Sequence, residues 1–207
     1  IEYFFPEGNE NIVISNEKLP TEKMNLLYNC ADGVVLASSA EGWGLSLTEA
    51  LLTGTPIIAN TTGGMQDQMR FEDENGEWYT PSPEVPSNHR KTYTKHGKWA
   101  LPVYPTNLSI VGSPQTPYIY DDRCSFEDVA NRIFELYSMS KEERQERGKA
   151  GLEWALSDEA GFTSEKMSNR IVEGMDELFK VWKPRPNYYI HRDTDHEPRK
   201  LEHSLIY

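Results

Sequence analysis

The sequence predicts an α/β fold in which a parallel sheet is flanked by helices. Two short apolar runs, residues 34–37 and 56–59, have the composition of buried strands. Between them lie a glycine-containing loop and a short helix that includes Ala50. The order strand, loop, helix, strand is that of a unit whose two strands lie parallel in one sheet. Three longer helical stretches follow between residues 125 and 182 and are expected to supply further cover.

Elements on either side of this unit continue the alternation. Residues 12–14 form an apolar run after a Gly- and Asn-rich turn and are predicted to be a strand. Pro20 suits the first turn of a helix that ends at Asp32-Gly33. One face of this helix is apolar and is predicted to pack against the sheet: Met24, Leu27, Tyr28 and Ala31. After the second strand, a turn containing Gly63 and Gly64 leads into a short predicted helix from Met65.

The C-terminal helices have sequence signals for their starts. Ser125 with Asp128, and Ser140 with Glu143, resemble capping boxes. A third helix is predicted from Thr163 or Ser164 until the prolines at 184 and 186. Its methionine and aromatic stripe is interpreted as a seam that packs in the core.

Residues 72–122 differ from the rest of the chain. They contain seven prolines and show hints of strands only at 99–101 and 118–120, so they are predicted to form a long loop-rich insertion. A local basic cluster lies in this stretch: His89, Arg90, Lys91, Lys95, His96 and Lys98. It is either a lid whose cations meet a substrate phosphate or a solvated surface. The solvated interpretation is favoured, since runs of charge usually lie in water.

Composition excludes several classes of partner. The formal net charge is −12, so binding to nucleic acid or to an anionic membrane surface is not expected. No apolar run approaches the roughly 20 residues of a membrane span, and no signal peptide is recognised. The two cysteines, Cys30 and Cys124, are expected to be reduced, with Cys30 buried. A cytoplasmic protein is predicted, and its start at Ile1 suggests a fragment. The histidines of the tail at 191, 196 and 203 lack the spacing of a metal site.

The segment between the two strands has the groups needed to bind a phosphate compound. Glu41 and Glu49 are its two acidic residues, and Gly42 and Gly44 between them allow backbone amides to approach a ligand. Carboxylates bind vicinal hydroxyls, whereas amides at a helix start favour an anion. Each group also has a purely structural interpretation. Residues 46–49 match a capping box that would use Glu49, Glu41 could lie in water, and Trp43 could be a core aromatic.

This segment is similar to the E-x7-E motif of group 1 glycosyltransferases, which are retaining enzymes of the GT-B fold. The motif is present as Glu41-Gly42-Trp43-Gly44-Leu45-Ser46-Leu47-Thr48-Glu49-Ala50. Flanking residues agree with it, and the resemblance extends over about residues 12–68.

The resemblance implies a set of roles. Glu49 would bind the nucleotide ribose, and Glu41 would act catalytically, holding hydroxyls of the donor sugar and facing positive charge at its anomeric carbon. Amides around Gly44, Leu45 and Ser46 would take the pyrophosphate. The other residues predicted to contact the donor are Gly42, Trp43, Gly63 and Gly64. Such enzymes are usually independent of metals, and no cofactor is expected besides the nucleotide-diphosphate sugar substrate.

Residues 1–182 are therefore predicted to be most of a Rossmann-like nucleotide-sugar-binding domain, followed by a tail at 183–207. An Arg/Lys pair that the family uses for pyrophosphate is not found before Glu41 in these residues, and the family's N-terminal acceptor domain is expected to lie outside them. The complete enzyme is expected to transfer a hexosyl group to an acceptor hydroxyl, on a sugar, a lipid-linked compound or a protein. This chain alone is expected to be inactive. The alternatives are a nucleotide-sugar epimerase of related fold and a non-catalytic sugar-nucleotide-binding module.

Overall fold

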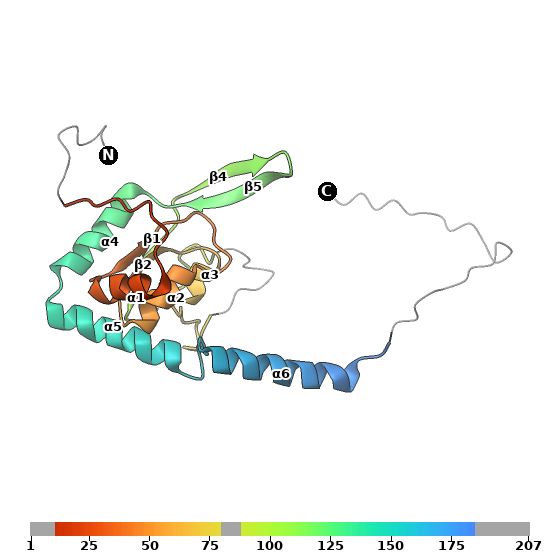
Figure 1. Ribbon diagram of the computed structural model, residues 1–207. Coiled ribbons are helices and arrows are strands. Elements are labelled where there is room, and N and C mark those ends of the chain that lie inside the picture. The colour runs from red at the N-terminus through yellow and green to blue at the C-terminus, as the bar shows by residue number, and fades with distance from the viewer. Residues whose placement is uncertain (1–10, 80–87, 185–207) are drawn as a thin grey trace. The chain divides into compact units, whose positions relative to one another are not determined.

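The computed structural model describes residues 11–79 and 88–184 (Figure 1). The chain divides into two units, of which the first ends at Lys166 and the second begins at Met167. The elements in order are α1 (Thr21–Cys30), β1 (Val34–Leu36), α2 (Leu45–Leu52), β2 (Ile57–Asn60), α3 (Gly64–Asp67), β3 (Ala100–Val103), β4 (Asn107–Ser113), β5 (Thr116–Arg123), α4 (Phe126–Ser138), α5 (Lys141–Leu156) and α6 (Ser164–Val181).

A parallel sheet with the strand order β1-β2-β3 confirms the predicted α/β class. Val34 of β1 is in register with Ile57 of β2, and Ile57 is in register with Ala100 of β3. The predicted unit of strand, loop, helix and strand is β1, α2 and β2. The carboxyl ends of all three strands therefore lie at one edge of the sheet, where the loop after β1 carries Glu41.

Both faces of the sheet are covered, which explains why every residue of β2 and β3 is buried. On one face, Ile57 and Ala59 pack in a cluster with Leu47 and Leu51 of α2 and Trp154 of α5. On the other face, the alternate residues Ile58 and Leu101 pack with Leu136 of α4. Successive side chains of a strand point to opposite faces, so β2 and β3 each contribute to two separate cores.

Helix α5 approaches α2 closely because small residues face the contact. A Cβ on Gly148 would lie 1.8 Å from the backbone oxygen of Gly54, which follows α2. A Cβ on Gly151 would lie 2.9 Å from Leu51 Cδ2. These two glycines cost helix propensity but allow backbone contact between the elements.

The predicted helix starts at Ser125 and Ser140 are confirmed. Ser125 Oγ accepts a hydrogen bond from the amide of Asp128 at 3.1 Å, and Ser140 Oγ accepts one from the amide of Glu143 at 3.1 Å. The capping box proposed at residues 46–49 is wrong. Helix α2 already begins at Leu45, and its N-cap is Gly44, whose φ of 84° is left-handed. Glu49 lies beyond the first turn and does not reach back to cap the helix.

Two further predictions in the N-terminal part are wrong, and a third is confirmed only in part. Residues 12–14 form no strand and Val13 is 88% exposed, because no described strand pairs with them. In α1, Tyr28 is buried and Met24 is partly buried, but Leu27 is exposed because the helix meets the core along a narrower face than expected. Cys30, at the end of α1, is exposed instead of buried; both cysteines are free, as predicted.

Residues 72–122 contain more regular structure than predicted. The strand hint at 99–101 corresponds to β3, which completes the central sheet. The hint at 118–120 lies in β5, which pairs antiparallel with β4 in a hairpin that extends away from the sheet (Figure 1). Proline occurs inside β3 as Pro102, at the edge of the sheet where a missing amide is tolerated. The prediction that residues 72–122 are an insertion relative to the family is not tested and stays a prediction.

The second unit is described as far as residue 184 and contains most of α6. No residue of α6 is buried, and its apolar stripe, including Met175 and Phe179, is exposed. The predicted core seam is therefore wrong for this helix, since the described part of its unit offers no second element to cover that face. Predictions about the tail from residue 185 onward lie outside the described residues. Among the helices of residues 11–79 and 88–184, none combines the length and apolar character needed to cross a membrane.

Candidate functional site

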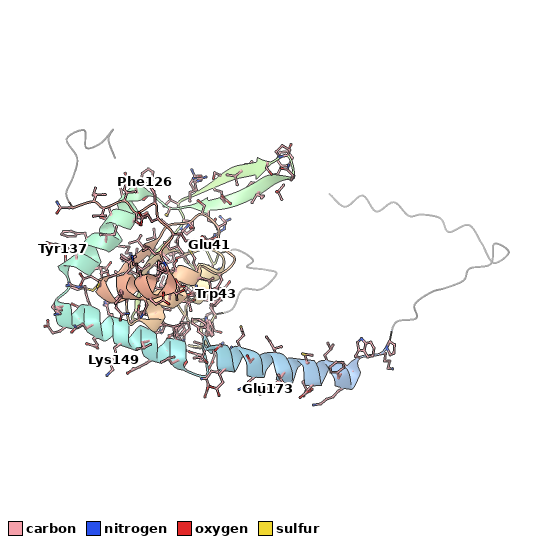
Figure 2. All side chains as sticks on the ribbon, viewed as in Figure 1. Glu41, Trp43, Phe126, Tyr137, Lys149 and Glu173 are labelled. Carbon is pink, nitrogen blue, oxygen red and sulfur yellow. The ribbon has the colours of Figure 1, made fainter. Side chains whose placement is uncertain are left out.

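Glu41 lies in the loop between the carboxyl end of β1 and the start of α2 (Figure 2). Its side chain is half-buried and lines a cavity of about 290 Å³. The lining residues come from three segments: Ser39, Ala40, Glu41, Gly42, Thr62, Gly63, Tyr120 and Asp122. A partly open cavity with two carboxylates, Glu41 and Asp122, among uncharged residues at the edge of a parallel sheet is a suitable place for a polyhydroxyl ligand.

Gly63 and Gly64 position this loop by close backbone packing. A Cβ on Gly63 would lie 2.4 Å from the backbone oxygen of Glu41, and one on Gly64 would lie 2.4 Å from the backbone oxygen of Gly42. The amide of Gly64 also donates to the Glu41 oxygen at 3.2 Å. The two predicted glycines therefore lie against the backbone of the loop that carries Glu41. Gly63 lines the cavity, whereas Gly64 is buried beneath the loop.

A buried glutamine that the sequence did not indicate holds the other side of the loop. Gln68 Nε2 donates to the backbone oxygens of Trp43 at 2.6 Å and Gly44 at 3.1 Å. Gln68 Oε1 accepts from Thr48 Oγ1 at 2.7 Å. Gln68 is fully buried, so these bonds are shielded from water and fix the loop relative to α2. No local pattern marks this residue, because its partners lie 20 or more positions away.

Trp43 has a structural role in this arrangement. Its Nε1 donates to Thr48 Oγ1 at 2.8 Å, and its ring meets the edge of Phe162 with centroids 5.3 Å apart. The core-aromatic interpretation is therefore supported. These contacts do not test the predicted contact between Trp43 and a donor, which stays a proposal.

The start of α2, four residues after Glu41 in the chain, offers backbone amides. The helix begins at Leu45, and the amides of a first turn have no carbonyl partner within the helix. Leu45 is exposed and Ser46 is half-buried. Gly42 faces open space, because a Cβ there would meet nothing within 4 Å, whereas a Cβ on Gly44 would lie 3.2 Å from Leu36 and Met65. Gly42 thus leaves room on the exposed side and Gly44 allows the turn into the helix.

Glu49 lies on the exposed side of α2 and does not line the cavity of Glu41. Its Oε2 accepts a hydrogen bond of 2.7 Å from the hydroxyl of Tyr28 on α1. Burial, and then this bond to Glu49, raise the pKa of Tyr28 to about 12, so the phenol remains a donor at neutral pH. Tyr28 therefore orients one oxygen of the carboxylate. The two carboxylates of the motif therefore lie in separate places, Glu41 in the loop before α2 and Glu49 on the helix.

Tyr120 and Asp122 of β5 complete the cavity and were not predicted as site residues. Asp122 Oδ2 accepts from Thr62 Oγ1 at 2.7 Å and from Asn88 Nδ2 at 2.6 Å. Its backbone oxygen accepts from Asn60 Nδ2 at 3.0 Å. Sequence indicated a strand here but not that this strand would lie against the turn after β2, because that contact spans about 60 positions.

The basic cluster is divided by the fold. His89 is 2% exposed and packs against Phe71 with ring centroids 4.3 Å apart, whereas the lysines at 91, 95 and 98 are exposed. Burial lowers the pKa of His89 to about 4, so this residue is neutral at pH 7. His89 consequently belongs to an aromatic core cluster and contributes no positive charge. His96 is half-buried and packs against the same Phe71 ring, with centroids 5.8 Å apart. Arg90 and the three lysines are exposed and agree with the solvated interpretation.

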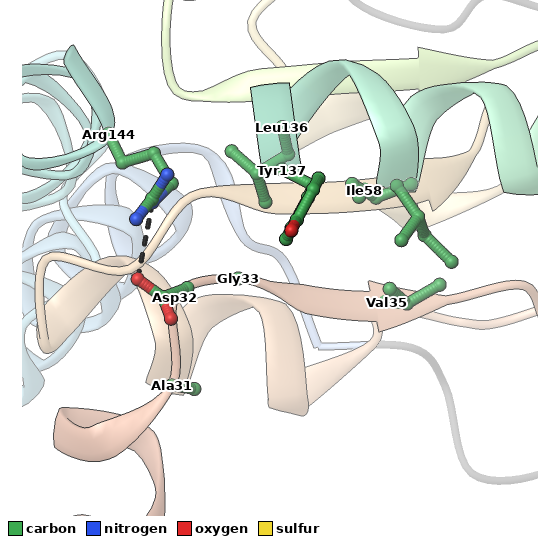
Figure 3. Close-up of a pocket in the computed structure, with 9 residues that line it drawn as sticks. Ala31, Asp32, Gly33, Val35, Ile58, Leu136, Tyr137 and Arg144 are labelled. Atoms are coloured by element: carbon green, nitrogen blue, oxygen red, sulfur yellow. Dashed lines mark hydrogen bonds and ion pairs between the residues drawn. The ribbon is translucent and has the colours of Figure 1, made fainter. Parts of the chain in front are cut away.

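A larger hollow of about 610 Å³ lies between β1 and α4 (Figure 3). Its lining is mainly apolar, with Val35 and Leu136, and includes an ion pair between Arg144 Nε and Asp32 Oδ1 at 3.2 Å. Asp32 and Gly33 directly precede β1, whereas Glu41 follows its carboxyl end. This hollow is therefore separate from the predicted site. Within the described ranges, no three His, Cys, Asp or Glu side chains are grouped as metal ligands.

The segment that carries this geometry resembles a known family. Residues 7–88 match the model of the family described as Glycosyl transferases group 1. The match confirms the resemblance to group 1 glycosyltransferases over that segment, which is less than half of the 207 residues and includes both motif glutamates.

Two relatives support the same family. A protein of Methanocaldococcus jannaschii named an uncharacterized glycosyltransferase is 35% identical over 60 residues, or 29% of this chain and 15% of that protein. A D-inositol 3-phosphate glycosyltransferase of Corynebacterium urealyticum is 43% identical over 47 residues, or 23% of this chain and 11% of that protein. The similarity thus spans a small part of either relative.

Proposed function

We propose that this chain supplies the donor-binding part of a retaining glycosyltransferase of the GT-B fold. The complete enzyme would transfer a sugar from a nucleotide-diphosphate sugar to an acceptor hydroxyl. The observation that carries this proposal is the position of Glu41, in a cavity at the carboxyl end of a parallel strand, within a segment that matches group 1 glycosyltransferases.

Each group of the segment has a role in the proposed transfer. Glu41 binds hydroxyls of the donor sugar and stabilises positive charge at the anomeric carbon as the bond to the diphosphate oxygen breaks. The amides of Leu45 and Ser46 stabilise the negative charge that develops on the diphosphate. Glu49, oriented by Tyr28, binds the ribose through its other oxygen. The acceptor oxygen forms the new bond to the anomeric carbon, and its proton passes to the departing diphosphate oxygen.

Four parts of this proposal rest only on the resemblance to group 1 glycosyltransferases. The hexosyl group, retention of configuration, independence from metals and a cytoplasmic location stay predictions. The acceptor domain is proposed to be another part of the enzyme, because the aligned segments span only 15% and 11% of the two relatives.

Replacement of Glu49 tests the nucleotide role. Glu49→Gln is expected to weaken binding of a nucleoside diphosphate such as UDP or GDP roughly 10- to 100-fold, because a charged hydrogen bond to ribose is lost. Isothermal titration measures the affinity. Glu22→Gln, which removes a carboxylate at an exposed position of α1, is the matched control, and its affinity should change little. An unchanged affinity in Glu49→Gln would remove the ribose role.

Replacement of Glu41 tests the role at the sugar. In the complete enzyme, Glu41→Gln is expected to reduce kcat by a factor of roughly 100 or more while nucleotide affinity changes little, because the lost charge acts on the transition state. Steady-state kinetics with analysis of the product and its anomeric configuration provide the measurement. Glu22→Gln, at an exposed position of α1, is the control for loss of one carboxylate. Equal losses in kcat and nucleotide affinity would contradict a specific role for Glu41.

A further inference from the structure

One wall of the Glu41 cavity belongs to strand β5 of the hairpin, which supplies Tyr120 and Asp122. The two residues lie two positions apart in the strand, so their side chains point to the same face of it. Asp122 fixes this face against the body of the first unit, because Thr62 and Asn88 both donate to its carboxylate. The side chain of Tyr120 is therefore directed to the same side, where it lines the rim of the cavity.

The exposed ring of Tyr120 is not explained by packing within the chain. Its side chain is 66% exposed, and among the described residues its ring pairs with no other aromatic ring and its hydroxyl has no hydrogen-bond partner. Ile110, which lies opposite it in β4, is 62% exposed. An exposed apolar surface beside a polar cavity is typical of a binding site for a ligand that has both polar and apolar parts.

A pyranose ring is a ligand of this kind. Its hydroxyl groups lie around the edge of the ring, whereas its C–H groups form an apolar face that can cover an aromatic side chain. Glu41 and the hydroxyl of Ser39 are hydrogen-bonding groups for the edge of such a ring, and Tyr120 offers a surface for its face. Because these groups come from the loop after β1 and from β5, a sugar held between the two segments is contacted on both its edge and its face.

The charges of the cavity restrict the kind of sugar. Among the described residues that line it are two carboxylates, Glu41 and Asp122, and no Lys, Arg or His. The side chains that donate to Asp122 are neutral, so its negative charge is held without an ion pair in the described part of the chain. Both carboxylates would repel a negative group on the sugar, and this repulsion is stronger near a protein surface than in bulk water. The cavity therefore suits an uncharged sugar better than a sugar acid.

We propose that Tyr120 is a specificity-determining residue on which the donor sugar stacks, and that the cavity selects an uncharged sugar over a sugar acid. This inference rests on the proposed function, because it takes the donor sugar to lie at Glu41. Tyr120 lies outside residues 7–88, the segment that matches the family model, so the family match assigns it no role.

Binding of nucleotide sugars to the 207-residue chain, measured by isothermal titration, tests this assignment. The probes are UDP, UDP-glucose and UDP-glucuronic acid; GDP, GDP-mannose and GDP-mannuronic acid replace them if GDP binds more tightly than UDP. We expect the neutral nucleotide sugar to bind roughly tenfold more tightly than the sugar acid. Tyr120→Ala should weaken binding of the neutral nucleotide sugar about fivefold and leave the nucleoside diphosphate within about twofold.

Three further variants separate stacking and charge from other causes. Tyr120→Phe keeps the ring and should retain the affinity for the neutral nucleotide sugar within about twofold. Tyr118→Ala is the matched control, since Tyr118 is exposed on the same strand but does not line the cavity, and all affinities should stay within about twofold. Glu41→Gln removes one of the two charges and should reduce the preference for the neutral sugar over the sugar acid roughly threefold. Equal thermal midpoints ensure that a loss does not come from unfolding.

The inference is overturned if Tyr120→Ala binds the neutral nucleotide sugar as the unchanged chain does, or if it loses the nucleoside diphosphate as well. It is also overturned if Tyr118→Ala or Tyr120→Phe loses as much affinity as Tyr120→Ala, if the sugar acid binds as tightly as the neutral sugar, or if Glu41→Gln leaves that preference unchanged. In each of these cases, binding of the nucleoside diphosphate that depends on Glu49 keeps the proposed function. If neither UDP nor GDP binds, the proposed function is overturned and the inference with it.

Discussion

At the scale of single residues, burial changes the chemistry of two ionisable groups close to the site. Asp67, at the end of α3, is half-buried, and its Oδ1 has no hydrogen-bond partner among the described residues. Loss of solvation raises the pKa of Asp67 to about 6. His89 shows the opposite effect, since burial disfavours its protonated form. Asp67 therefore destabilises the fold when it is ionised, and His89 destabilises it when it is protonated.

Asp67→Asn is expected to stabilise the protein at pH 7 to 8 by roughly 1–3 kcal/mol, because the ionised carboxylate has lost solvation without gaining a partner. The folded pKa lies above the unfolded one, so this group favours folding below about pH 4, and that contribution is lost as pH rises through about 6. Urea unfolding from pH 4 to 8 should show the gain shrinking towards low pH. Asp176→Asn, at an exposed position of α6, should show no such pH dependence. A gain independent of pH would contradict the assigned cause.

At the scale of elements, the helices differ in why they contain glycine. In α5, Gly148 lies against the backbone of Gly54, so its lack of a side chain sets the distance between the elements. In α6, a Cβ on Gly174 would meet nothing within 4 Å. The same residue type is thus required by packing in one helix and has no packing role in the other.

Gly148→Ala is expected to destabilise the protein by about 2 kcal/mol or more, although alanine favours a helix by about 1 kcal/mol, because the new methyl group would overlap the Gly54 backbone oxygen. Gly174→Ala is the matched substitution and should be neutral or stabilising by up to about 1 kcal/mol. Thermal unfolding of both variants provides the comparison. Similar effects of the two changes would mean that α5 moves away from α2 without cost.

At the scale of the whole molecule, Asp122 joins parts of the first unit that are distant in sequence. It links the hairpin β4–β5 to Thr62 after β2, and to Asn88. Its burial among these donors closes one wall of the Glu41 cavity. The cavity therefore depends on an arrangement of three segments, of which only one carries the E-x7-E motif.

Asp122→Ala is expected to cost roughly 2–4 kcal/mol, because two buried donors lose their acceptor. Asp121→Ala changes the neighbouring carboxylate, which does not line the cavity, and should cost less than about 1 kcal/mol. Urea unfolding measures both. Equal stabilities of the two variants would show that the hairpin does not depend on Asp122.

The sequence by itself determined the elements whose signals are local. The parallel pair β1 and β2 follows from two apolar runs, the starts of α4 and α5 follow from Ser125 and Ser140, and Glu41 follows from the motif. Each of these depends on neighbours within a few positions, so periodicity and caps are sufficient to predict it.

Only the tertiary structure decided what surrounds these elements. It placed Tyr120 and Asp122 beside Glu41, directed Glu49 to Tyr28, and left residues 12–14 without a strand partner. These outcomes depend on contacts between residues about 20 to 60 positions apart, and no local pattern in one sequence specifies them. Burial of single residues also depends on distant contacts. Cys30 is exposed because of which face of α1 meets the core, whatever its residue type.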